Sequence, residues 1–101
     1  MKPITGNEPE REVESYLRKG VKYAGGISYK WVSPGQSGVP DRIVFWPHSQ
    51  VDLVELKTTT GKLSPIQKLQ IGRIEDVTGM KVHVLYGMED VKKYLEERVR
   101  R

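Results

Sequence analysis

The stretch Gly38-Val39-Pro40-Asp41 and the later Glu55-Leu56-Lys57 decide how this chain folds and what it can do. Side chains alternate between the two faces of a strand, so Glu55 and Lys57 point the same way if their segment is extended. Asp41, at the start of a neighbouring strand, then brings a second carboxylate to the same place. Two carboxylates and an ammonium group can hold Mg²⁺, help to activate a water molecule and stabilise charge on a phosphate.

An alternative interpretation is that Glu55 and Lys57 form a solvated row on one face of a half-exposed antiparallel strand. The surrounding strand is otherwise rich in apolar residues, where a charged pair is costly unless something compensates it. That cost, together with the Pro-Asp pair upstream, favours a functional site.

Length and composition exclude several classes of protein. The chain has 101 residues, a formal net charge of +4 and no cysteine. We expect one domain over residues 1–101 with its core at about 9–98, and no disulfide, zinc–cysteine site or cysteine nucleophile. No stretch approaches the roughly 20 apolar residues of a membrane span, and the first residues lack the apolar stretch of a signal peptide. We therefore expect no membrane partner and a cytoplasmic protein.

The first expected helix begins near Pro9, with Asn7 as a possible cap, and ends at about Lys19 or Tyr23. At about 100° per residue, Glu10 lies inside the angular range of the apolar stripe of this helix. Acidic residues in a first turn often serve only as partners of the helix dipole. Both roles stay open for Glu10 on this pattern alone.

Four strands and two more helices are expected after this helix. The strands are Ile27 to Val32, Asp41 to Trp46, Val51 to Thr58 and Lys81 to Tyr86, and the helices run from Ser64-Pro65 to Thr78-Gly79 and from Met88 to Arg98. A serine cap followed by proline is typical of a helix start, and glycine of a helix end. The second helix should bury Ile66, Leu69, Gln70, Arg73, Ile74 and Val77. Because a helix joins strands three and four, those strands should be parallel and the sheet mixed.

With these motifs in this order, the chain resembles the VRR-NUC domain of the PD-(D/E)xK nuclease superfamily, as a standalone phage or bacterial-type member. The resemblance covers roughly residues 10–90. Its matching segments are Glu10-Arg11-Glu12-Val13-Glu14, Gly25-Gly26, Gly38-Val39-Pro40-Asp41-Arg42, Val54-Glu55-Leu56-Lys57 and Leu63-Ser64-Pro65-Ile66-Gln67. It implies an α/β (α+β) fold with a restriction-endonuclease-like core, in α-β-β-β-α-β order, and a divalent-metal phosphodiesterase.

The resemblance also implies a role for each matching residue. Asp41 and Glu55 would be metal ligands, Lys57 would position or activate the attacking water, and Glu10 would be the first-helix glutamate of the family. The backbone carbonyl of Leu56 is a further candidate ligand.

Gln67 matches the glutamine that follows the Ser-Pro of the family and is expected to contact the site. The helical pattern is less decisive, because Gln70 lies nearer the centre of the expected buried side. The implied cofactor is Mg²⁺, with Mn²⁺ expected to substitute.

Standalone members of this family look like enzymes that resolve DNA junctions. We therefore expect a homodimer that cuts four-way (Holliday) junctions or other branched DNA, since a two-fold dimer presents two sites to a symmetric substrate. The alternatives are a general or site-specific duplex endonuclease, and a non-catalytic DNA-binding module. The intact Asp41, Glu55 and Lys57 argue against the last of these. The sequence does not indicate whether a helicase partner is needed.

Overall fold

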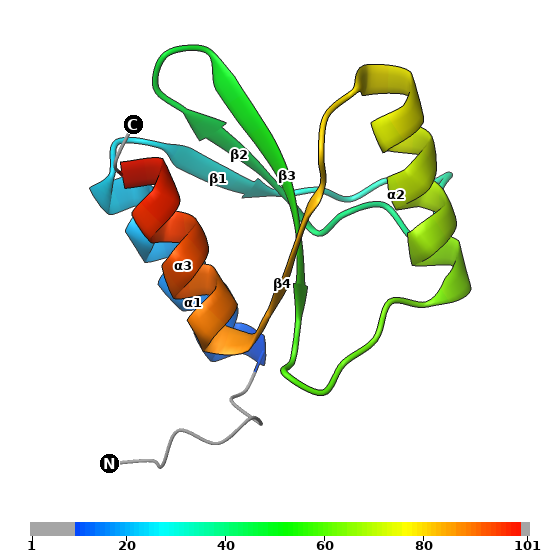
Figure 1. Ribbon diagram of the computed structural model, residues 1–101, viewed down its shortest axis with the longest axis horizontal. Helices are drawn as coiled ribbons and strands as arrows, with labels where there is room; N and C mark the ends of the chain where they lie inside the picture. Colours follow the sequence, from blue (N-terminus) through cyan, green and yellow to red (C-terminus); the bar gives the residue numbers. More distant parts are fainter. Residues whose placement is uncertain (1–9, 100–101) are drawn as a thin grey trace.

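A computed structural model describes residues 10–99 of the chain. Its elements are α1 (Glu10–Tyr23), β1 (Ile27–Lys30), β2 (Arg42–Trp46), β3 (Gln50–Lys57), α2 (Pro65–Thr78), β4 (His83–Tyr86) and α3 (Gly87–Val99). The predicted α-β-β-β-α-β order, followed by a last helix, is confirmed (Figure 1). The predicted cap Asn7 and helix start Pro9 lie outside the described residues.

The four strands form one mixed sheet in the order β1-β2-β3-β4. β1–β2 and β2–β3 are antiparallel, whereas β3–β4 is parallel, as predicted from the helix between them. Figure 1 shows α1 and α3 side by side on one side of the sheet and α2 on the other. None of the helices within residues 10–99 is both long and apolar enough to cross a membrane.

The hydrophobic core lies between the sheet and the pair α1 and α3. It consists of Val13, Leu17, Val21, Val44, Trp46, Val54, Leu56, Leu85, Val91, Tyr94 and Leu95. Gly20 lets the two helices approach closely, because a Cβ at this position would overlap the side chain of Leu95. α1 and α3 are thus fixed on the face of the sheet that carries Val54 and Leu56.

Three strands are shorter than predicted, and β2 loses one residue because it begins at Arg42 rather than Asp41. β1 ends at Lys30 rather than Val32, although the Trp31 amide still donates to the Asp41 carbonyl at 2.7 Å. β4 begins at His83 because the amide of Val82 donates to a Glu75 side-chain oxygen of α2, at 2.8 Å, instead of joining the sheet.

The prediction of which residues α2 buries is wrong. The buried residue of this helix is Ile71, whereas Ile66, Leu69 and Val77 are exposed. Figure 1 shows α2 on the other side of the sheet from α1 and α3, so neither of these helices covers its apolar residues. A periodic pattern identifies an apolar side but not whether the fold supplies a partner for it.

The face of the sheet turned away from α1 and α3 is partly open. Ile27 pairs with Phe45, and Phe45 with Val51, which places these three apolar side chains on one face. Ile27 and Tyr29 are 53% and 58% exposed, and Phe45 and Val51 are each 42% exposed. We call these four residues the open sheet face. Alternation along β3 puts Glu55 on the same face as Val51.

Candidate active site

The hairpin of β2 and β3 brings Asp41 beside Glu55. Arg42 pairs with Val54 in the antiparallel hairpin, so Asp41, which precedes Arg42, lies next to Glu55, which follows Val54. The amide of Leu56 donates to Asp41 Oδ2 at 3.1 Å, which fixes the Asp41 carboxylate against β3.

Glu55 is buried, with 2% of its surface exposed, and its two carboxylate oxygens differ in their surroundings. Oε2 accepts a hydrogen bond from Gln67 Nε2 at 3.1 Å and lies 3.8 Å from Lys57 Nζ. Oε1 is buried without a hydrogen-bond partner among the described residues. A buried carboxylate oxygen is normally satisfied, so this one is free to bind something from outside.

The electrostatics of Glu55 favour a cation beside its carboxylate. Burial, and next the neighbouring charge of Asp41, raise the pKa of Glu55 to about 7, although Lys57 opposes them. One ammonium group therefore does not balance two adjacent carboxylates in this buried place. A divalent cation between them would supply the remaining charge and a partner for Oε1, so the donor set fits a metal that prefers oxygen ligands.

The start of α2 orients Gln67. Ser64 caps the helix: its Oγ accepts from the Gln67 amide at 3.2 Å, while Gln67 Oε1 accepts from the Ser64 amide at 2.9 Å. With Oε1 held in this way, the amide group presents Nε2 to Glu55. The Ser-Pro pair predicts the cap. The bond from the Ser64 amide to Gln67 Oε1 was not predicted, although the Ser-x-x-Gln pattern of a capping box indicates it.

The structure brings neither of the other two predicted ligands, Glu10 and Leu56, to the Glu55 carboxylate by a hydrogen bond or ion pair within residues 10–99. Glu10 is exposed as the first residue of α1, and within residues 10–99 no hydrogen bond or ion pair joins it to Asp41 or Glu55. The Leu56 side chain belongs to the core, and its amide contacts Asp41. In this part of the chain no three His, Cys, Asp or Glu side chains form a metal-binding group. A metal here would therefore use two carboxylates and complete its shell with water, backbone or substrate oxygens.

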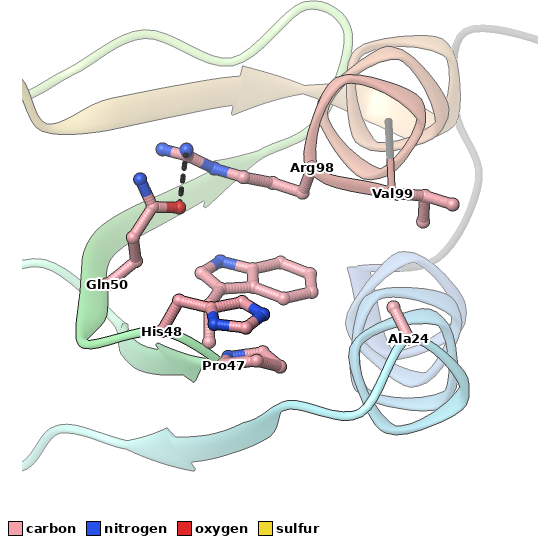
Figure 2. A pocket seen from close by; sticks show the side chains of 7 residues that line it. Ala24, Pro47, His48, Gln50, Arg98 and Val99 are labelled. Carbon is pink, nitrogen blue, oxygen red and sulfur yellow. Dashed lines mark hydrogen bonds between the residues drawn. The ribbon is translucent and has the colours of Figure 1, made fainter. Parts of the chain in front are cut away.

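A pocket of about 460 Å³ lies elsewhere in the molecule, between the β2–β3 turn and the ends of α1 and α3 (Figure 2). Its lining is Ala24, Trp46, Pro47, His48, Gln50, Arg98 and Val99, and it includes none of the predicted site residues. Its buried polar groups already have partners: the Trp46 indole donates to Asp52 and Tyr94, and Arg98 donates to Asp52 and Gln50. These bonds hold the β2–β3 hairpin against α3.

Three comparisons with known proteins agree. A family model of the VRR-NUC domain matches residues 24–89, a span that contains Asp41, Glu55, Lys57 and Gln67 but begins after Glu10. "Putative nuclease p44" of Acyrthosiphon pisum secondary endosymbiont phage 1 is 42% identical over 65 residues, which are 64% of this chain and 70% of that protein. A solved VRR_NUC domain is similar with a TM-score of 0.80 and 30% identity, covering 86% of this chain and 94% of the other.

Proposed function

Because the chain belongs to the VRR-NUC domain family of nucleases, we propose that it is a divalent-metal-dependent endonuclease that cuts branched DNA, four-way junctions above all, as a homodimer. One observation carries the catalytic part of this proposal. It is the buried, unpartnered Oε1 of Glu55, next to Asp41 and on the same face of β3 as Lys57.

The chain's own residues divide the work. Asp41 and Glu55 would hold the metal, with the Leu56 carbonyl as a further ligand. Glu10, exposed at the start of α1, is a candidate ligand only by the family resemblance. A bound divalent ion supplies positive charge that makes water easier to deprotonate and offsets charge on the phosphate. We take Mg²⁺ as the metal, with Mn²⁺ able to replace it, because the ligands are all oxygen atoms.

Lys57 and Gln67 act on the same centre from two sides. The Lys57 ammonium, 3.8 Å from Glu55 Oε2, adds a donor and a positive charge where a phosphate would become more negative. Gln67 Nε2 donates a hydrogen bond to Oε2 of Glu55, which leaves Oε1 of Glu55 for the metal.

The homodimer is supported by the open sheet face. Clustered exposed apolar side chains often mark interaction surfaces, and these four lie on the face that also carries Glu55. Two copies joined by a two-fold axis would hold two sites in one particle, which suits a symmetric four-stranded substrate.

The test compares cleavage of a labelled four-way junction with cleavage of its linear duplex arms in Mg²⁺, Mn²⁺ or EDTA. Wild type is run beside Asp41→Ala and Lys57→Ala. We expect metal-dependent cutting of the junction that both substitutions abolish. Equal cutting of the linear arms would indicate a general endonuclease. Tight DNA binding without cleavage in either metal would indicate a non-catalytic DNA-binding module.

A further inference from the structure

A row of cations runs along the outer side of α1. Arg11, Arg18 and Lys22 follow one another at intervals of seven and four residues, which places them on one side of the helix. Lys19 lies beside them, and all four are exposed. The row spans about 16 Å at 1.5 Å per residue. We call these four residues the α1 cation row.

Part of the row borders a groove. Between α1 and β1, which forms one edge of the sheet, lies a groove of about 440 Å³. It is lined by Arg18, Lys19, Lys22, Gly26, Ile27 and Ser28. The groove therefore has three cations on its helical wall.

Among residues 10–99, no ion pair joins a cation of the row to an acid. Within residues 10–99, the ion pairs found join Arg42 to Glu14 and other residues outside the row. Glu14, one of three glutamates of α1, lies 3.4 Å from the buried guanidinium of Arg42, which also donates to Ser28 at 2.8 Å. The charge of Glu14 is thus directed toward Arg42 rather than toward the row. Burial lowers the pKa of Arg42, Glu14 opposes this, and the charge of Arg18 lowers it further.

Helix-dipole effects do not explain the whole row. A lysine in the last turn, such as Lys22, is favoured by the dipole. Arg11 is in the first turn, where the dipole disfavours a positive charge. Arg18 lies between the two turns, so another reason is needed for a continuous row.

The row begins at the catalytic end of the sheet. The Glu14–Arg42 pair holds the first half of α1 beside the residue that follows Asp41. From there α1 runs toward its end at Tyr23, close to the start of β1. In Figure 1, α1 begins at the same end of the molecule at which β3 terminates. The row and Glu55 lie on opposite sides of the sheet, so a DNA strand that leaves the active site and bends around this end of the sheet would reach the row.

We propose that the α1 cation row binds the phosphate backbone of one DNA arm and holds that arm beside the active site. This inference rests on the proposed function for its choice of DNA as the ligand. Arginine and lysine side chains neutralise phosphates without reading sequence, so the contact adds affinity and orientation but no base preference.

The test measures binding of a labelled four-way junction by fluorescence anisotropy in EDTA, from about 50 to 300 mM salt. The variant Arg18→Gln/Lys22→Gln is compared with wild type and with Lys81→Gln/Lys93→Gln, a control that removes the same charge from exposed positions before β4 and on α3. Each phosphate contact contributes about 0.9 to the slope of log affinity against log salt. We expect the row variant to lose about 1.8 of this slope and at least about tenfold in affinity at low salt, and the control to keep both.

Equal effects of the two variants would overturn the proposal, because total charge alone would then explain binding. An unchanged slope in the row variant, or wild type that does not bind DNA, would overturn it as well. Thermal melting of both variants checks that they fold. Because binding is measured without metal, the two proposals can fail separately: a wild type that binds through the row but never cuts contradicts the nuclease alone, and a wild type that cuts while the row variant binds normally contradicts the row alone.

Discussion

Glu55 is the residue on which the proposed chemistry depends. Its burial, its unpartnered Oε1 and its carboxylate neighbour Asp41 make its charged form unfavourable when no cation is bound. A solvated glutamate on a half-exposed strand, the alternative weighed from the sequence, would be neither buried nor raised in pKa. The same cost becomes a driving force for binding a divalent ion.

This cost predicts how pH and metal change stability. The pKa of Glu55 rises from its ordinary 4.5 to about 7 on folding, so its effect on stability becomes unfavourable as pH increases from about 4.5 through 7. Metal binding needs the deprotonated carboxylate. We therefore expect Mg²⁺ to raise the melting temperature by several °C at pH 8 and by much less at pH 5.5, as measured by scanning calorimetry.

The variant Glu55→Gln is the control for that measurement. Without metal at pH 8, it should melt above wild type because it removes the buried charge, and Mg²⁺ should not change its melting temperature. A response to Mg²⁺ as large as that of wild type would show that the metal binds elsewhere.

At the scale of elements, the start of α2 connects stability with the site. The side chains of Ser64 and Gln67 each accept a hydrogen bond from the other residue's backbone amide. The Gln67 Nε2 group then donates to Glu55. Ser64→Ala removes the cap and should lower the free energy of unfolding by about 1 kcal/mol. It should also slow cleavage at saturating DNA, since the helix turn that holds Gln67 loosens.

Ser64→Thr is the matched control, because threonine also caps helices and should restore most of both quantities. Urea denaturation measures the stability, and single-turnover cleavage measures the rate. If Ser64→Ala were as stable and as fast as wild type, the capping box would have no part in placing Gln67.

β3 and α3 are joined by a buried polar network centred on Asp52. Asp52 accepts hydrogen bonds from the Trp46 indole and the Tyr94 hydroxyl and pairs with Arg98 at 2.7 Å. Burial alone would raise the pKa of Asp52, but hydrogen bonds from His83 and Tyr94 and the charge of Arg98 outweigh it and lower the pKa to about 2. The stability that this carboxylate contributes is present above about pH 3.8 and is lost as pH falls toward 2.

Asp52→Asn should therefore destabilise the protein at pH 7 by about 3–5 kcal/mol, because it leaves Arg98 without its buried partner. The variant should also lose less stability than wild type between pH 4 and pH 2. Urea denaturation at several pH values measures both effects. An acid dependence identical to that of wild type would mean that other carboxylates control acid unfolding.

Local signals explain why several elements could be predicted. Ser64 caps α2 and Gly79 ends it with a left-handed φ of 73°, a conformation that glycine adopts easily. Alternation along β3 predicts Glu55 and Lys57 on the same face, and the Lys57 ammonium lies 3.8 Å from Glu55 Oε2. These features depend on residues that are close in sequence.

Long-range packing explains what could not be predicted. The exposed Leu69 and Val77 of α2 have the spacing of buried residues, yet neither α1 nor α3 covers them. The bonds of Asp52 to Tyr94 and Arg98 join residues more than 40 positions apart, and no local pattern encodes them. The unpartnered Oε1 of Glu55 likewise follows from how β2, β3 and α2 meet.

At the scale of the whole molecule, the two sides of the sheet differ. α1 and α3 pack on one side of the sheet and form the hydrophobic core with it. The open sheet face on the other side carries four exposed apolar side chains. Phe45→Asp would place a charge in the centre of a dimer contact on this face. We expect wild type to sediment as a dimer at micromolar concentrations and Phe45→Asp as a monomer.

Val77→Asp is the control for association, since Val77 is exposed, apolar and on α2 rather than on the open sheet face. It should sediment like wild type. A monomeric wild type, or a Phe45→Asp variant that remains dimeric, would contradict the assignment of this face.

The most direct measurement is single-turnover cleavage of a labelled four-way junction in Mg²⁺ at pH 8 by wild type, Glu55→Gln and Glu97→Gln. Glu97 is exposed on α3 and provides the same change of charge away from the site. We predict that wild type and Glu97→Gln cut only when metal is present, and that Glu55→Gln is slower by about 10³-fold or more because one metal ligand is lost. Cleavage by Glu55→Gln at the wild-type rate, or by wild type in EDTA, would contradict a metal-dependent active site at Glu55.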